Sequence, residues 1–390
     1  MPAADTIITL ELGQYRLRAP LAGSSYGLVW RAEAPHGGPD VAIKLINEEQ
    51  MARAPERQRA RWIDCARTEI AFLEALEAWD ERHIVRLLDS GEHQGLPVMA
   101  LELMNVDLAR HVASARSGGH AIDFAQSLAW IGQINQALAK VHQYGWRYLD
   151  LKPANVLLDL QLRTVKLADF GTSRLLAEGG PHPYAGTANW QAPEQFFPDG
   201  ELGYRTDART DYFALGAMFY YLVTGGLPLR FCSDCGQAYR AHRADAAPAL
   251  RAQHNGAIPP TLRADEAALF VHRVEQQFRQ AGDQRWHGGG AAASGASAAL
   301  TLLCALIAGE RAARPRHALE ISRLIGAVRA SMADEPAHAA SVRALPARAS
   351  SLGGGAAGGA SNLVARSGAS VGVGARGIFS EARRLPRSAA

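Results

Sequence analysis

The chain has 390 residues, more than one ordinary domain requires, and 48% of them are hydrophobic, enough to bury a sizeable core. Its formal net charge of +3 is that of an ordinary solvated surface and gives no reason to expect nucleic-acid binding. Four cysteines are too few for a disulfide framework, and the first residues lack a charged stretch followed by an apolar one. We therefore expect a cytoplasmic protein without a secretory signal.

Short strands dominate the predicted structure of the first hundred residues. Apolar runs predict strands at residues 15–22, 27–33, 40–46, 84–91 and 96–104. Between the third and fourth of these, apolar residues recur at three- and four-residue steps, from Trp62 through Ala66, Ile70 and Leu73. That spacing is typical of one helix face, so we predict a helix over 59–79.

Helical patterns dominate from about residue 105 onward, with loop-rich stretches near residues 150 and 169. The sequence therefore predicts an α+β, bilobal fold, with a β-rich lobe of about 13–104 that contains one helix and an α-rich lobe of about 105–330. Residues 291–309 carry no charge and are nearly long enough to span a bilayer. Most are Ala, Ser and Gly, and the strongly apolar part, LTLLCALI, has only the length of a buried helix, so we expect no membrane span.

The composition changes near residue 331 to Ala, Gly, Ser and Arg, as in SSLGGGAAGGASNLVARSG. Such a stretch buries too little apolar area to offset its chain entropy, so we predict a disordered tail over 331–390. From Pro336 onward it contains seven Arg against one Glu. We interpret this excess as a solvated surface; an arm that binds an anionic partner is the alternative.

Three segments carry side chains suited to phosphoryl transfer, which needs a lysine on the phosphate oxygens, metal-binding oxygens and a carboxylate near the incoming hydroxyl. They are VAIK (41–44), YLDLKPANVLL (148–158) and ADFGTSR (168–174). Each alone has an ordinary interpretation: a strand with a surface lysine, a helix-to-strand loop, and a turn. Their order along one chain makes the shared chemical interpretation the better one.

Together with GTANWQAPEQ (186–195), these motifs resemble those of the protein kinase family, in particular the eukaryotic-like Ser/Thr kinases found in bacteria. The resemblance covers roughly residues 13–329. It implies an enzyme that uses ATP and Mg²⁺ to phosphorylate Ser or Thr hydroxyls of protein substrates. It identifies neither the substrate, nor the activating signal, nor the oligomeric state.

The resemblance implies a role for each polar residue of the two loop motifs. Asp150 would orient or deprotonate the acceptor hydroxyl. Lys152, a signature of the Ser/Thr type, would contact the γ-phosphate. Asn155 and Asp169 would hold Mg²⁺ through hard oxygen atoms. Phe170 would pack between the lobes.

The resemblance also implies a nucleotide site in the first lobe. Lys44 would bind the α- and β-phosphates and would be held by Glu69. Leu101 would be the gatekeeper, and Asp107 would contact the ribose or cap a helix, two roles that are compatible. The remaining expected nucleotide contacts are Leu21, Val29, Ala42, Leu157 and the hinge residues Glu102 and Met104.

Scaffold roles follow from the same resemblance. Glu194, in the APE sequence, would pair with Arg314 in a late helical segment. Asp211 would brace the catalytic loop from a helix. Thr187 would hydrogen-bond to Asp150 and its lysine neighbour, which supports Ser/Thr specificity.

The phosphate-covering loop departs from the family pattern. The positions that should be glycine are Ala22, Ser24 and Gly27, within LAGSSYGLV. Glycine allows the closest approach of backbone to phosphate, so we expect weaker ATP binding or a slightly different loop course. The donors are backbone N–H groups, which Ala and Ser also supply.

A second departure is Tyr148-Leu149 in place of the His-Arg that most relatives carry before the aspartate. That arginine normally pairs with an activation-loop phosphate. With Leu149 there is no cation to neutralise, so our hypothesis is that activity does not depend on activation-loop phosphorylation through this contact.

Cys232 and Cys235 lie in FCSDCGQAY, which has the spacing of half a zinc site, with His242 and His254 as possible completing ligands. Only half of a standard site has convincing spacing, so we favour a pair of reduced cytosolic thiols, with a zinc site as the alternative. Two other functions compete with protein phosphorylation. A pseudokinase would act as a nucleotide-binding scaffold without turnover. A small-molecule kinase would share the fold but would not need the APE segment.

Overall fold

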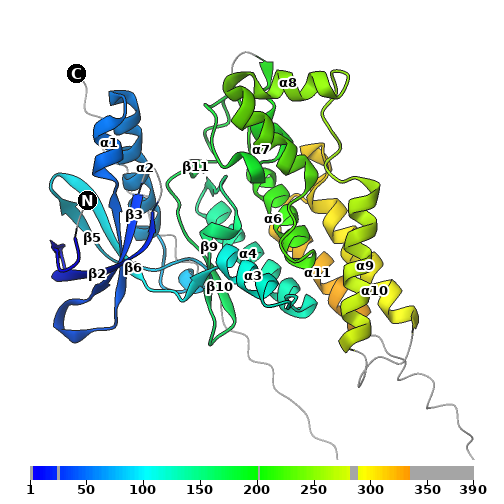
Figure 1. Cartoon of the computed structure of the whole chain (residues 1–390), viewed down its shortest axis with the longest axis horizontal. Coiled ribbons are helices and arrows are strands. Elements are labelled where there is room, and N and C mark those ends of the chain that lie inside the picture. The colour runs from blue at the N-terminus through cyan, green and yellow to red at the C-terminus, as the bar shows by residue number, and fades with distance from the viewer. Residues whose placement is uncertain (1–2, 24–26, 201–202, 282–288, 334–390) are drawn as a thin grey trace, which may run out of the picture. The chain divides into compact units, whose positions relative to one another are not determined.

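The computed structural model describes residues 3–23, 27–200, 203–281 and 289–333, all within the unit Met1–Pro336 (Figure 1). Ser24 and nearly all of the predicted tail lie outside the described residues. In Figure 1 the N-terminal sheet and its helices run from blue to cyan, and the helical part runs from cyan to orange. The predicted α+β arrangement of a β-rich part followed by a helical part is confirmed.

The N-terminal part is built on an antiparallel sheet. Its strands are β1 Ile7–Thr9, β2 Gln14–Gly23, β3 Gly27–Glu33, β4 Val41–Ile46, β5 Leu87–His93 and β6 Leu96–Glu102. Their order across the sheet is β1-β2-β3-β4-β6-β5. Sequence analysis predicted five of them and missed β1, because three residues are too few to show an alternating pattern.

Strand β4 separates two hydrophobic clusters. Val41, Ile43 and Leu45 are buried in a cluster that belongs to the sheet itself, whereas Ala42 is buried in the larger cluster that extends into the helical part. Successive side chains of a strand point to opposite faces. Lys44 therefore shares the face of Ala42 and is directed toward the helical part.

Helix α2, Glu56–Glu74, supplies the predicted helix of the first part and follows a short helix, α1 Glu48–Arg53. Its buried face contains Trp62, Glu69, Phe72 and Leu73. The prediction extended the helix to residue 79, but the backbone N–H of Glu77 donates instead to the Tyr144 hydroxyl at 3.1 Å. That tertiary contact, which the local pattern does not encode, removes the last predicted turn.

Nine helices are described after the sheet. They are α3 Leu108–Ser117, α4 Phe124–Gln143, α5 Pro193–Phe196, α6 Ala208–Val223, α7 Arg230–His242, α8 Ala246–Gln253, α9 Ala264–Ala281, α10 Gly289–Leu306 and α11 Ala318–Ala333. Two small antiparallel sheets accompany them. One has the order β10-β9-β7, from Thr164–Leu167, Val156–Asp159 and Val106–Asp107, and the other pairs β11 Arg174–Leu175 with β8 Trp146–Arg147.

Helix α10 contains most of the uncharged stretch considered as a membrane span. It packs against α6, α9 and α11 and buries Ala299, Leu302 and Leu303. Gly216 of α6 lets it approach, because a Cβ there would lie 2.5 Å from a methyl of Ile307. In the described ranges no helix is both long and apolar enough to cross a bilayer.

The start of α5 is tied to the segment before α11 by a buried ion pair. The Arg314 guanidinium donates to both carboxylate oxygens of Glu194, at 2.7 and 2.9 Å, and its side chain is fully buried. It also donates to the carbonyls of Ala308 and Arg209 and lies over the Phe213 ring. This is the scaffold contact that the resemblance implied.

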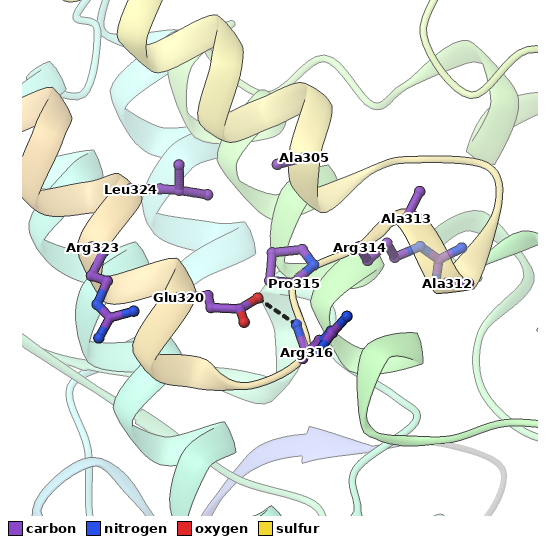
Figure 2. Close-up of a pocket in the computed structure, with 9 residues that line it drawn as sticks. All are labelled: Ala305, Ala312, Ala313, Arg314, Pro315, Arg316, Glu320, Arg323 and Leu324. Atoms are coloured by element: carbon purple, nitrogen blue, oxygen red, sulfur yellow. Dashed lines mark hydrogen bonds between the residues drawn. The ribbon is translucent and has the colours of Figure 1, made fainter.

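A surface hollow of about 530 Å³ lies beside this pair (Figure 2). Its lining includes Pro315, Leu324 and the Arg316–Glu320 turn, where the Arg316 N–H donates to Glu320 at 2.7 Å. Figure 2 draws Arg314 among the residues that line it. Apart from Arg314, no residue that lines the hollow belongs to the predicted site.

Replacing Arg314 with Met should lower the free energy of unfolding by about 3 kcal/mol, because it leaves the Glu194 carboxylate without its partner. Urea denaturation measures the loss. Arg205→Met is the matched control, since its pair with Asp199 is solvent-exposed at 3.2 Å and is worth less than about 1 kcal/mol. Equal losses in the two variants would contradict the prediction.

Candidate active site

The loop that carries Asp150 runs from β8 to β9, and hydrogen bonds to Asp211 of α6 hold it in place. The Asp211 carboxylate accepts from the backbone N–H groups of Tyr148 and Leu149 at 2.8 and 2.7 Å, and from His142 Nε2 at 2.8 Å. Leu149 has a φ of 68°, a left-handed conformation that is costly for a side chain other than glycine. The buried Asp211 contacts hold the loop in that shape.

Asp150 is the centre of a short polar network. Its carboxylate accepts from Lys152 Nζ at 2.7 Å and from the Thr187 hydroxyl at 2.7 Å, and Lys152 also donates to that hydroxyl at 3.0 Å. These are the hydrogen bonds that the resemblance implied for Thr187. The Asn155 amide nitrogen donates to the Asp150 backbone carbonyl at 3.0 Å and to its carboxylate at 3.2 Å.

Burial raises the pKa of Asp150 above its ordinary value, while the charge of Lys152 and the hydrogen bonds from Lys152 and Thr187 partly offset that rise. A carboxyl group with a raised pKa is a better proton acceptor once it is ionised. The environment of Asp150 therefore suits a group that receives a proton from a neighbouring hydroxyl.

Two ion pairs connect the sheet to α2 and to the loop after β10. They join Lys44 of β4 to Glu69 of α2 and to Asp169 of that loop. Lys44 Nζ lies 2.6 Å from the Glu69 carboxylate and 2.9 Å from the Asp169 carboxylate. The Glu69 side chain is 2% exposed, whereas that of Asp169 is 49% exposed. Glu69 is therefore a structural anchor, and Asp169 keeps oxygen atoms available to a ligand.

The charges of this triad depend on one another. Burial disfavours the charged form of Lys44, but Asp169 and Glu69 outweigh it, so the pKa of Lys44 lies above its ordinary value. Lys44 in turn lowers the pKa of Asp169. Burial raises the pKa of Glu69, and Lys44 opposes that rise. Asp169 is thus held ionised at neutral pH.

Phe170 follows Asp169 in the chain and is fully buried. Its ring lies 4.5 Å from that of Phe72 of α2 and 5.1 Å from that of Tyr148. The Tyr148 hydroxyl donates to the Ala168 carbonyl, next to Asp169. Tyr148, at the position of the expected histidine, therefore connects the two loops by packing and by a hydrogen bond.

The oxygen atoms of Asn155 and Asp169 fit the metal that the motifs imply. The Ala168 N–H donates to the Asn155 backbone carbonyl at 2.9 Å, which brings the two loops side by side. The amide nitrogen of Asn155 is already used by Asp150, so its amide oxygen is the atom suited to a cation. A carboxylate and an amide oxygen with room for water and phosphate oxygens match Mg²⁺.

The predicted adenine contacts lie in one hydrophobic cluster. Ala42 pairs with Leu101 across β4 and β6, and both are buried in the larger cluster with Leu21, Val29 and Leu157 packed against it. These side chains therefore belong to one continuous core, which also extends through the helical part. Glu102 and Met104 lie at the end of β6 and just beyond it.

Sequence analysis missed two charged partners of the expected hinge. Lys166 of β10 lies 2.5 Å from the Glu102 carboxylate. Arg110 of α3 lies 3.3 Å from the Asp107 carboxylate and donates to the Leu21 carbonyl at 3.2 Å. Asp107 is the N-cap of α3, as its alternative role required. The i,i+3 spacing of Asp107 and Arg110 was the available signal; nothing local pointed to Lys166.

The structure gives no support to the possible zinc site at the cysteine pair. Cys232 and Cys235 are buried on α7, and burial raises the pKa of both thiols, whereas zinc binds the thiolate. Among the described residues no group of three or more Cys, His, Asp or Glu side chains could hold a metal ion. Gly236 in the same motif has a packing role, since a Cβ there would lie 1.5 Å from the Asn189 side-chain oxygen.

Comparison with known sequences decides the family. Residues 20–315 match the sequence profile of the protein kinase domain, which is most of the chain. The chain belongs to the protein kinase family. The matched region contains all of the polar residues described above for the site and its scaffold, from Lys44 to Arg314.

The kinase domain is similar to several Ser/Thr kinases. It is 30% identical over 277 residues to serine/threonine-protein kinase PknD of Mycobacterium tuberculosis, an alignment that covers 70% of this chain and 39% of that protein. It is 28% identical over 258 residues to serine/threonine-protein kinase pkn2 of Myxococcus xanthus, covering 64% and 28%. A carbon catabolite-derepressing protein kinase of Candida tropicalis is 29% identical over 219 residues, covering 56% and 32%. The chain therefore spans about a third of the length of these relatives.

Proposed function

We propose that this protein transfers the γ-phosphoryl group of ATP to Ser or Thr hydroxyls of protein substrates. The observation that carries the proposal is the joint placement of Lys44, Asp150, Asn155 and Asp169, in which each charged side chain is paired with an opposite charge and Asn155 donates to Asp150. Family membership and similarity to Ser/Thr kinases support it.

The residues divide the work between binding and proton handling. Lys44, fixed by Glu69, places a cation for the phosphate oxygens. Asp150 receives the proton of the acceptor hydroxyl, and Lys152 beside it neutralises charge on the transferred group. Asn155 and Asp169 would hold Mg²⁺, which would neutralise charge on the phosphates.

A nucleotide-binding pseudokinase is the main alternative. Two departures from the family pattern favour it: Ala22 at a glycine position of the phosphate-covering loop, and Tyr148-Leu149 in place of His-Arg. Such a scaffold would not require the Asp150 network with Lys152 and Thr187, which positions an acceptor hydroxyl rather than a nucleotide. A small-molecule kinase would likewise not require the Glu194–Arg314 pair beneath a protein-binding segment.

Asp150→Asn should abolish phosphate incorporation when the protein is incubated with Mg²⁺ and ATP, because the amide cannot accept the proton. Intact mass spectrometry of the native and variant proteins measures incorporation, and thermal unfolding checks that the variant is folded. Incorporation by the folded variant at the native rate, or none by the native protein on itself or on any added protein, would contradict the proposal.

We further propose that activity does not require an activation-loop phosphate. Leu149 offers no cation, and its carbonyl accepts from the Gln195 side chain at 2.9 Å. Gln191 donates to the Ala185 carbonyl at 2.8 Å, and the buried Arg147 donates to the Glu178 carbonyl at 2.9 Å. Side-chain-to-backbone hydrogen bonds thus hold the segment where other kinases use a phosphate.

Phosphatase treatment should leave the rate of phosphate transfer unchanged within about twofold. Arg147→Met should lower that rate by roughly tenfold, because it removes one of these hydrogen bonds and its charge assistance. Steady-state kinetics on the treated protein and on the variant test both. The idea is wrong if phosphatase abolishes activity and an acidic substitution at Thr172 or Ser173 restores it.

A further inference from the structure

Residues 184–190, here called the acceptor segment, lie where a substrate hydroxyl would be presented. Thr187 of this segment donates to the Asp150 carboxylate at 2.7 Å. The Tyr184 ring stacks on Tyr239 of α7, with centroids 4.9 Å apart and planes 7° from parallel. The segment is therefore a fixed surface on α7 beside the proton-accepting carboxylate.

Three arginines surround the acceptor segment. Arg61 of α2 donates to the Tyr184 carbonyl at 3.4 Å, and Arg240 of α7 donates to the Asn189 side-chain oxygen at 3.4 Å. The Arg243 guanidinium lies 5.7 Å from the centroid of the ring that stacks on Tyr184. All three side chains are exposed. Arg61 lies on α2, whereas Arg240 lies on α7 and Arg243 directly follows that helix, so their convergence is a property of the fold.

The positive charge of these arginines is not balanced within the described part of the chain, where none of the three forms an ion pair. Asp234, the acidic residue of α7, pairs instead with Arg263 at 2.7 Å. Asp64 and Asp245, the nearest acidic neighbours in sequence, are exposed and pair with none of them. The surface beside Asp150 is thus cationic.

We propose that the preferred acceptor is a Ser or Thr flanked by anionic side chains, which Arg61, Arg240 and Arg243 bind. Tyr184 and Asn189 are three and two residues from Thr187, so they lie within roughly 11 Å of it along the segment. The nitrogens of Arg61 and Arg240 lie 3.4 Å beyond these two residues. Such surface charges contribute more to partner choice than to affinity. This inference rests on the proposed phosphotransfer and names its substrate class.

The anionic groups can be carboxylates or phosphates, since guanidinium binds both. The chain's own Arg-rich sequence from Pro336 onward has the wrong sign for this surface, with seven Arg against one Glu. A separate acidic or already phosphorylated protein segment is therefore the occupant that the charges favour.

Three peptides that differ only in the residues flanking one Ser test the proposal: glutamate, phosphoserine or lysine on both sides. With the full-length protein, kcat/KM for the glutamate or phosphoserine peptide should exceed that for the lysine peptide by about tenfold at low salt, and the preference should fall as salt rises. A larger value for phosphoserine than for glutamate would identify phosphate as the preferred group.

The double variant Arg61→Glu with Arg240→Glu should reverse the preference toward the lysine peptide, a change in the ratio of about 10- to 100-fold. A merely structural role of these arginines would lower all three rates and leave the ratio unchanged. Arg67→Glu is the matched control, because Arg67 lies on the same helix as Arg61 but is 3.8 Å from Glu92 of β5. This variant should keep the native ratio of kcat/KM between the glutamate and lysine peptides.

The proposal is overturned if the native protein prefers the lysine peptide or has no preference, or if the double variant keeps the acidic preference. If no peptide receives phosphate, fluorescence anisotropy can still measure how tightly the labelled glutamate peptide binds to the native protein and to the double variant. Binding that is lost in the double variant would support the cationic surface while the proposed activity fails. Equal binding by both proteins would overturn the inference itself.

Discussion

The pairing of one partly buried ammonium, that of Lys44, with two carboxylates is the interaction on which the rest of the site depends. Lys44 comes from the sheet, Glu69 from a helix and Asp169 from a loop of the helical part, and their contacts are 2.6 and 2.9 Å long. A charge removed from water is stable only beside opposite charge. Nucleotide-binding groups from both parts of the chain can therefore act together only while this pairing is intact.

The same constraint recurs in the helical part. The Asp211 carboxylate accepts hydrogen bonds from two backbone N–H groups of the Asp150 loop and from His142. The Arg314 guanidinium donates to Glu194, which follows the acceptor segment in the chain. In both cases a buried charge has its partners in a different element. The apolar core sets the distances between elements, and these charged residues fix the loops whose backbone the core does not order.

Sequence alone predicted the β-rich and helical parts and the residues that converge at the site, because each lies in a short motif whose chemistry depends on its immediate neighbours. Beyond the pairs that the resemblance implied, such as Glu194 with Arg314, it did not predict contacts set by tertiary packing. Tyr144 ends α2 earlier than its apolar pattern indicates, and Lys166 reaches Glu102 from a distant strand. The C-x-x-C-G sequence suggested zinc, whereas Gly236 makes room for Asn189, a reason visible only once the two segments are adjacent.

Nucleotide binding measured by isothermal titration calorimetry tests the central claim most directly. A non-hydrolysable ATP analogue should bind the native protein with an affinity that depends on Mg²⁺. Lys44→Met should weaken that binding at least tenfold, and Asp169→Asn should remove its Mg²⁺ dependence. Binding that is absent in the native protein, or that is indifferent both to Mg²⁺ and to the loss of Lys44, would contradict the account.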